Sequence, residues 1–181
     1  MTPDAGRTDV ADAARRAIRD VPDFPKPGVV FKDITPLLAD AALFRRVTAA
    51  LADPFRDRGI THVVAIESRG FILGAPVAQL LGAAFVPVRK PGKLPSRTVR
   101  EAYALEYGTD AVEMHVDALA NAGGVLLVDD VLATGGTAAA TCRLIERAGG
   151  RVAGCSFLLE LTFLRGREPL AGRRVDALLQ Y

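Results

Sequence analysis

The sequence predicts an α/β fold in which a mostly parallel central sheet carries helices on both faces. Apolar runs of single-strand length occur at residues 63–66, 84–88, 125–128 and 152–161. They contain few polar residues, which is typical of strands that are covered on both faces. Segments with helical periodicity lie between them, and this alternation of strand and helix favours parallel pairing.

The first fifty residues are predicted to hold two helices with a proline-rich stretch between them. Val10, Ala14 and Ile18 recur at helical spacing, so one face of the first helix is apolar. Residues 22–36 are too rich in proline to form a helix. The second helix is predicted to begin near Asp40, whose side chain suits a helix N-terminus.

Between the predicted strands, helices are expected at residues 72–81, 117–122 and 138–148. Gly82 follows the first of them and Gly149 the last, and glycine ends helices because it adopts the left-handed conformation without strain. Helices in these places would be the crossover connections that parallel strands require.

Residues 90–108 form a different kind of segment, which is polar and interrupted by proline and glycine. A connection of this length in a compact domain is usually a lid, a binding loop or a solvated excursion. Lys90, Lys93, Arg97 and Arg100 lie in it, close to a Glu–Tyr pair. Four cations in one segment favour a lid over an anionic ligand.

The composition is that of an ordinary globular protein. The 181 residues are 50% hydrophobic and 24% charged, and we expect one domain, residues 1–181. The net charge of +2 does not indicate nucleic-acid binding. Residues 1–20 lack the apolar core of a secretory signal, and glycine and proline interrupt the uncharged stretch 71–88, so no membrane span is predicted. We expect a cytoplasmic protein with Cys142 and Cys155 as small core residues.

The strongest functional signal lies between residues 125 and 137. A buried strand leads to Asp129 and Asp130, and the small-residue loop 133–137 then enters a helix. Such a loop binds phosphate through backbone amides at the helix N-terminus, and Thr134 adds a hydroxyl donor. The two acids would repel a phosphate, so they face a metal ion or the hydroxyls of a sugar. A phosphorylated sugar satisfies every part of this motif.

Two common phosphate-binding motifs are absent, because the sequence holds neither G-x-x-x-x-G-K-[ST] nor any G-x-G. A tight turn with a helix cap would explain the glycines and threonines of residues 133–137, but not the adjacent acids. The acids follow a buried strand, where α/β folds bind ligands, and we therefore favour a binding site.

The segment 125–137 resembles the phosphoribosyl-diphosphate (PRPP) signature of type I phosphoribosyltransferases. Four further segments are similar to the adenine phosphoribosyltransferases of that family, at residues 23–38, 67–71, 89–95 and 103–108. The resemblance implies the type I phosphoribosyltransferase fold, with a small N-terminal hood at about 22–38 and a mobile lid loop at about 90–108. It also implies a loop at 67–71 that binds diphosphate and often carries a cis peptide bond.

The implied reaction joins adenine and PRPP to give AMP and diphosphate, a step of purine salvage. It is a glycosyl transfer at the anomeric carbon, so its transition state should have oxocarbenium character. The implied cofactor is Mg²⁺, bound mainly through the diphosphate of PRPP rather than through protein ligands. The resemblance further implies a homodimer, with neither nucleic acid nor membrane as a partner.

The resemblance assigns catalytic roles to four residues. Asp129 and Asp130 would hold the ribose hydroxyls, Arg69 would meet the diphosphate, and Glu106 would transfer a proton to and from the purine. The residues assigned to PRPP are Ser68, Arg69, Arg89, Lys90, Lys93, Tyr107, Asp129, Asp130, Ala133, Thr134, Gly135, Gly136 and Thr137.

Adenine is assigned to four residues by the same resemblance. Phe31 would stack on the base, Val131 would cover its other face, and the main chain at Val30 and Lys32 would read its edge. Arginine is common in the family at the position of Lys32, which leaves a side-chain role there open.

Three other functions compete with this interpretation. A transferase for hypoxanthine, xanthine or orotate would share the PRPP site, but residues 23–38 argue against it. A PRPP-sensing regulator would have kept the fold and lost catalysis, usually with a damaged lid or a nucleic-acid-binding extension. A scaffold protein has no support beyond ordinary structural explanations of each motif.

Overall fold

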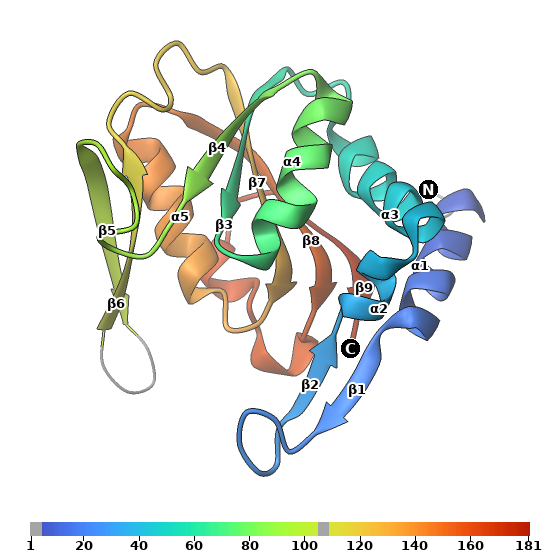
Figure 1. Ribbon diagram of the computed structural model, residues 1–181. Helices are drawn as coiled ribbons and strands as arrows, with labels where there is room; N and C mark the ends of the chain where they lie inside the picture. Colours follow the sequence, from blue (N-terminus) through green and yellow to red (C-terminus); the bar gives the residue numbers. More distant parts are fainter. Residues whose placement is uncertain (1–4, 105–108) are drawn as a thin grey trace. The chain divides into compact units, whose positions relative to one another are not determined.

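The computed structural model describes residues 5–104 and 109–181 (Figure 1). The chain divides into two compact units, Met1–Ala50 and Leu51–Tyr181, which are described separately below. The elements of the first unit are α1 (Ala5–Ala17), β1 (Arg19–Pro22), β2 (Val30–Asp33), α2 (Thr35–Ala39) and most of α3 (Ala41–Ala52).

The first unit confirms the two predicted helices and shows more order between them than the prolines suggested. β1 and β2 form an antiparallel hairpin, and Pro36 lies in the first turn of α2, where its missing N–H costs nothing. Asp40 caps α3, because its carboxylate accepts hydrogen bonds from the amides of Ala42 and Leu43, both at 3.0 Å. The buried apolar residues of the first unit include Val10, Ala14, Ile34, Leu37 and Val47.

The second unit is built on a five-stranded parallel sheet in the order β4-β3-β7-β8-β9. Its elements are η1 (Asp53–Phe55), β3 (Ile60–Ile66), α4 (Arg69–Leu81), β4 (Ala84–Val88), β5 (Thr98–Ala104), β6 (Thr109–His115), β7 (Gly124–Leu132), α5 (Gly136–Arg147), β8 (Arg151–Glu160), η2 (Thr162–Leu164), η3 (Glu168–Leu170) and β9 (Val175–Gln180). The predicted parallel sheet is therefore confirmed.

Helices cover both faces of this sheet, as predicted. Successive residues of β3 point to opposite faces. Val64 packs in the cluster that α5 covers, whereas Ala65 lies against Gly74 of α4. Two right-handed crossovers that run in opposite directions along the sheet produce this arrangement.

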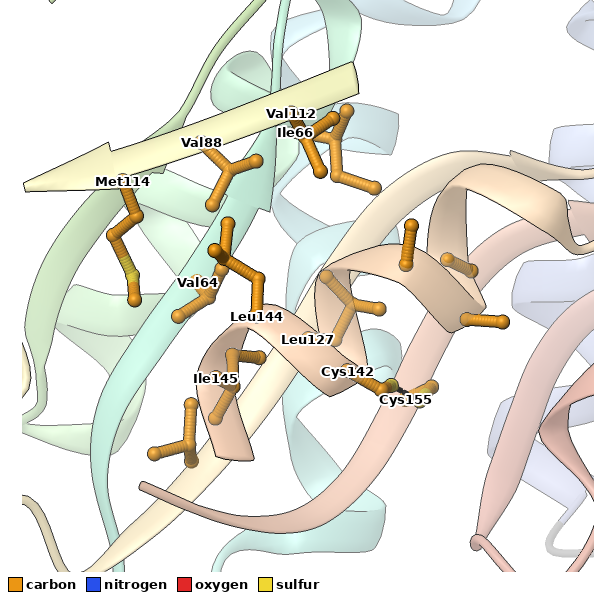
Figure 2. Close-up of a cluster of buried hydrophobic side chains, with 14 of the residues drawn as sticks. Val64, Ile66, Val88, Val112, Met114, Leu127, Cys142, Leu144, Ile145 and Cys155 are labelled. Atoms are coloured by element: carbon orange, nitrogen blue, oxygen red, sulfur yellow. Dashed lines mark hydrogen bonds between the residues drawn. The ribbon is translucent and has the colours of Figure 1, made fainter. Parts of the chain in front are cut away.

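The main core lies between the sheet, α5 and β6 (Figure 2). Val64 and Leu127 of the sheet face Leu144 of α5, and Met114 of β6 closes one side. Cys142 and Cys155 belong to the same cluster as free, fully buried thiols whose sulfur atoms are 3.7 Å apart, which confirms them as core residues. The burial of so many apolar side chains stabilises this unit by about 25 cal/mol for each Å² removed from water.

The largest difference from the sequence prediction concerns residues 90–108, where a polar lid loop was expected. Residues 98–104 instead form β5, which pairs with β6 in antiparallel register from Thr98–His115 to Ala104–Thr109. The strands escaped prediction because only one face of the hairpin is apolar. Val112 and Met114 of β6 are buried, while most of their neighbours are polar.

Several predicted bounds also need correction. The helix expected at 117–122 is a series of turns, whose hydrogen bonds span three residues instead of four. α4 begins at Arg69, three residues before its prediction, and β7 continues to Leu132 because β8 pairs with it as far as Glu160. β9 was not predicted. No helix within residues 5–104 and 109–181 is long and apolar enough to cross a membrane.

Candidate active site

The two predicted acids lie in the last part of β7, in the middle of the sheet. Val128 is fully buried, Asp129 is half-buried and Asp130 is 5% exposed. The amide of Asp130 donates a 2.9 Å hydrogen bond to Oδ1 of Asp129, so the two side chains are tied through the backbone. This is the carboxyl end of a parallel strand, where α/β proteins place ligands.

Arg69 lies beside these acids. Its Nε is 2.6 Å from Oδ2 of Asp130, so Arg69 is the cation of an ion pair at the carboxyl end of β7. Arg69 is the first residue of α4, and its Ser68 neighbour is the N-cap. The positive end of the α4 dipole therefore points toward the same place as the guanidinium.

The two carboxyl groups differ from ordinary acids in their proton affinity. Burial raises the pKa of Asp129 well above its usual value, and the charge of Asp130 raises it further. Burial also raises the pKa of Asp130, although the Arg69 guanidinium opposes this change. Such perturbed acids in one place are typical of a functional site.

A glycine allows α4 to approach the acids. A Cβ on Gly70 would lie 2.7 Å from Oδ1 of Asp129 and 3.4 Å from the carbonyl oxygen of Val128. Any larger residue would therefore push the first turn of α4 away from β7. The glycine after Arg69 thus brings the arginine and the acid pair together.

The segment before α4 contains a cis peptide bond between Glu67 and Ser68, as the resemblance implied. The carboxylate of Glu67 lies 3.0 Å from Nε of Arg89, which follows β4. Nη1 of Arg89 also donates to the carbonyl of Lys93 at 3.2 Å. Glu67 therefore links the predicted diphosphate loop to a predicted lid cation, a role that the sequence did not reveal.

Lys90 is held by a second acid that sequence reasoning missed. Its Nζ pairs with Oδ2 of Asp110 on β6, and the hydroxyl of Tyr103 on β5 donates to the same oxygen at 3.1 Å. Lys93 is exposed close by in the chain. No local pattern could have identified Asp110, because the contact depends on the unpredicted β5–β6 pairing.

The loop 133–137 has the geometry of an anion site. Gly135 is the N-cap of α5 with φ 78°, and Gly136 begins the helix. The first amides of a helix have no partner within it, so those of Gly136 and Thr137 can face an anion. Ala133 and Thr137 are half-buried and Thr134 is exposed. We call residues 133–137 the phosphate loop.

The residues assigned to adenine are described within their own units. In the first unit Phe31 is half-buried, with its ring edge-to-face against Phe24 at 5.2 Å, and Val30 is exposed. Lys32 pairs with Asp20 across the hairpin at 2.6 Å. In the second unit Val131 is half-buried on β7.

Two predicted residues, Glu106 and Tyr107, lie outside the described residues. Within the parts that are described, no group of three His, Cys, Asp or Glu side chains could hold a metal ion.

The chain is similar to known proteins of one family. A family model described as "Phosphoribosyl transferase domain" matches residues 33–167. The chain is 60% identical over 172 residues to an adenine phosphoribosyltransferase of Myxococcus xanthus, covering 95% of this chain and 93% of that relative. The solved adenine phosphoribosyltransferase of Rhodothermus marinus has a TM-score of 0.91 and 56% identity, covering 96% of this chain and 99% of that one. The Saccharomyces cerevisiae enzyme, complexed with an imino-altritol bisphosphate and adenine, has a TM-score of 0.89 and 36% identity, covering 95% and 99%.

Proposed function

The chain belongs to the adenine phosphoribosyltransferases of the phosphoribosyl transferase family, and we propose that it transfers the 5-phosphoribosyl group of PRPP to adenine, giving AMP and diphosphate. The observation that carries this proposal is the acid pair at the end of β7, with Arg69 on one side and the phosphate loop after it. The acid pair matches the ribose hydroxyls, Arg69 matches the diphosphate, and the backbone amides of the phosphate loop match the 5-phosphate.

Asp129 and Asp130 bind the ribose hydroxyls in this proposal. As the bond from the anomeric carbon to diphosphate breaks, positive charge develops on the ring, and the negative charge of the acid pair favours it. Burial raises the pKa of Asp130, and the ion pair with Arg69 opposes this rise and so favours the charged form. The adenine nitrogen then bonds to the anomeric carbon, and Glu106 accepts the proton that the base releases.

The leaving diphosphate is met by cations from two elements. Arg69 and the N-terminus of α4, with Ser68, receive it from one side. Arg89, Lys90 and Lys93 follow β4 and supply further positive charge. Lys90 is held by Asp110 in this structure, so the phosphates of PRPP would compete with that carboxylate for the ammonium group.

Mg²⁺ is proposed as an ion carried mainly by the diphosphate of the substrate. The described residues offer no cluster of three metal-ligating side chains, and Asp130 is paired with Arg69. Mg²⁺ generally binds phosphate oxygens and keeps several waters, and when bound it would neutralise charge on the diphosphate. Asp129 and Asp130 are the acids nearest to that position in the proposed arrangement.

Adenine recognition is proposed for Val30, Phe31, Lys32 and Val131. Phe31 offers an aromatic face, which gives affinity for any flat base. β2 pairs with β1 in a two-stranded hairpin, and main-chain groups that hydrogen-bond to the edge of a base can distinguish an amino from an oxo purine. Asp20 occupies the ammonium group of Lys32, which supports a main-chain role at this position.

A base panel tests the proposed function. The protein is incubated with PRPP and Mg²⁺, and adenine, hypoxanthine, guanine, xanthine and orotate are offered separately while nucleotide formation is followed. We expect AMP from adenine alone. A product from another base would keep the PRPP site and overturn the adenine assignment, and PRPP binding without any product would indicate a regulator.

Three further properties belong to the same proposal. The chain works as one phosphoribosyltransferase domain, forms a homodimer and acts in the cytoplasm. Small enzymes commonly form symmetric dimers. Light scattering on the purified protein tests the dimer, and a mass equal to the 19.2 kDa monomer at micromolar concentration would contradict it.

A further inference from the structure

The phosphate loop lies against a segment that no part of the proposed function uses. Residues 161–170, which we call the brace, follow β8 and contain η2 and η3. In Figure 1 the brace and the turn after β7 lie at the same end of the sheet. The contact is backbone against backbone. A Cβ on Gly166 would overlap the carbonyl oxygen of Ala133, and a Cβ on Gly135 would overlap the carbonyl oxygen of Gly166.

The brace is fixed to the sheet by a buried acid. Nε and Nη2 of Arg167 donate to the carboxylate of Glu160 at 2.8 to 3.0 Å, and Nη1 donates to the carbonyl of Val175 at 3.1 Å. Glu160 is 3% exposed, and its carboxylate also accepts a hydrogen bond from the side-chain amide (Nε2) of Gln180 at 3.2 Å. A guanidinium that donates to both carboxylate oxygens is fixed in orientation as well as in position.

Backbone hydrogen bonds complete the attachment at both ends of the brace. The amide of Leu161 donates to the carbonyl of Leu132, the last residue of β7, at 2.9 Å. Thr162 donates to the carbonyl of Tyr181 through its amide at 2.9 Å and its hydroxyl at 2.6 Å. The segment is thus joined to β7, β8 and the chain end after β9.

We propose that the brace sets the position of the phosphate loop, so that Gly166 and Arg167 are positioning residues for the 5-phosphate of PRPP. The inference rests on the proposed assignment of that phosphate to residues 133–137. Arg167 does not contact the phosphate in this arrangement, because Glu160 and Val175 already accept its hydrogen bonds. It acts by holding Gly166 against the carbonyl of Ala133.

The physical reason is the sensitivity of an anion site to the direction of its amides. Several N–H groups must converge on one phosphate, and each must point along its hydrogen bond. A loop of small residues has few side-chain contacts that could fix its own shape. Here Gly166 packs directly on the loop backbone, so a shift of the brace is transmitted to the amides without any flexible side chain between.

The test uses two variants and a matched control in the same segment. Arg167→Gln removes the charge that pairs with Glu160, and Arg167→Lys keeps the charge but loses the two-oxygen contact. Arg165→Gln is the control, because the side chain of Arg165 forms an exposed ion pair with Glu168 in the same segment. Binding of ribose 5-phosphate, and separately of inorganic diphosphate with Mg²⁺, is measured by calorimetry. The temperature is kept well below the thermal unfolding midpoint of each protein.

For Arg167→Gln we expect affinity for ribose 5-phosphate to fall about tenfold, since displacing a binding group by an ångström can cost on the order of a hundredfold. Affinity for diphosphate should stay unchanged, because that ligand uses the α4 end of the site. Arg167→Lys should recover part of the loss, and Arg165→Gln should change either affinity by less than about twofold. In steady-state assays the KM for PRPP should rise while the KM for adenine stays the same.

The outcomes separate a positioning role from a purely structural one. If Arg167→Gln lowers the unfolding midpoint but binds ribose 5-phosphate as tightly as the parent, the inference is wrong. Equal losses for ribose 5-phosphate and diphosphate would also overturn it, because they would indicate general loosening. If the unchanged protein does not bind ribose 5-phosphate at all, the phosphate assignment under the proposed function fails instead.

A second substitution addresses the contact itself. Gly166→Ala places a methyl group against the carbonyl of Ala133 and 2.9 Å from Cγ of Leu132. We expect the same selective loss of ribose 5-phosphate affinity, with the ion pair of Arg167 intact. Gly172→Ala is the control, because its Cβ would meet nothing within 4 Å while its positive φ adds backbone strain that Gly166 lacks, so it reports general destabilisation without contact. Equal binding by Gly166→Ala and the parent would contradict the proposed contact.

Discussion

The acids on β7 and the cations near the β5–β6 hairpin are held in place by different means. Asp129 and Asp130 extend from a strand with neighbours on both sides, and the loop after them is packed on the brace. The hairpin is attached to α5 by Glu101, which pairs with Arg143 and Arg147, both at 2.7 Å, and Lys90 is attached to the hairpin by Asp110. The acids are positioned by buried backbone. The hairpin packs on the core through Val112 and Met114, but the cation Lys90 is held by a side-chain ion pair near the surface.

This difference teaches what each region can do during turnover. Groups that must meet the transition state with little reorganisation belong on rigid elements, and the acid pair satisfies that condition. Exposed ion pairs are worth about 0–1 kcal/mol each and exchange readily with water or a ligand. The hairpin cations can therefore be redirected toward phosphates when PRPP binds.

The largest expected effect comes from breaking the rigid region. Asp129→Asn combined with Asp130→Asn should lower kcat by about a thousandfold or more, because both groups that favour the developing positive charge are lost. The fold should persist, since burial already disfavours both charges and raises the pKa of each carboxyl. Asp57→Asn, at an exposed position, is the control for the assay of AMP formation. Near-normal turnover by the double variant would remove the ribose assignment.

The second-largest expected effect comes from removing Glu106, the residue proposed to transfer a proton to and from the purine. Glu106→Ala should lower kcat by about a hundredfold, the lower range for general acid–base catalysis, while the KM for PRPP changes by less than about threefold. Glu106 lies outside the described residues, so this expectation rests on the resemblance and the family. The matched control is Glu168→Ala, which removes an exposed glutamate. An unchanged kcat would make Glu106 an ordinary surface residue.

A smaller effect is expected from loosening the hairpin. Glu101→Gln removes the acceptor of two guanidinium groups, so amide hydrogen exchange should accelerate in residues 98–104 and 109–115 while β7 stays protected. The KM for PRPP should rise by about two- to fivefold, the size expected when one or two surface ion pairs are lost. The control is Glu146→Gln, which breaks a different ion pair, between Glu146 of α5 and Arg173. Equal exchange in both variants would show that the hairpin does not depend on Glu101.

The same contrast explains which parts could be predicted from the sequence. The strand and acids at 125–130 were predictable because burial on both faces leaves an uninterrupted apolar run. β4 was predicted at its exact bounds because its run is also apolar, although it is a partly exposed edge strand. β5 and β6 were not, since a strand with one polar face resembles a polar loop. Asp110 pairs with Lys90, and Glu160 pairs with Arg167. No local sequence motif connects either acid with its partner, so the sequence did not indicate them.

The smallest expected effect separates the two regions by their response to acid. Hydrogen bonds from arginine lower the pKa of both Glu160 and Glu101, from Arg167 in the first case and from Arg143 and Arg147 in the second. Each acid therefore contributes stability that is fully present above the unfolded pKa, about 4.3, and is lost as the pH falls through the lower folded pKa.

Urea unfolding between pH 5 and pH 3 would measure these contributions. Arg167→Gln should lose about 1 kcal/mol at pH 5, because it leaves the buried Glu160 with only the weaker amide of Gln180, and its stability should depend less on pH than that of the parent. Arg143→Gln should lose less, since Arg147 still pairs with Glu101 in partly solvated surroundings. A loss for Arg143→Gln as large as that for Arg167→Gln would contradict the distinction between a buried brace and a surface attachment. The ion pairs of Glu101 would then have to be regarded as equal in strength to the buried pair of Glu160.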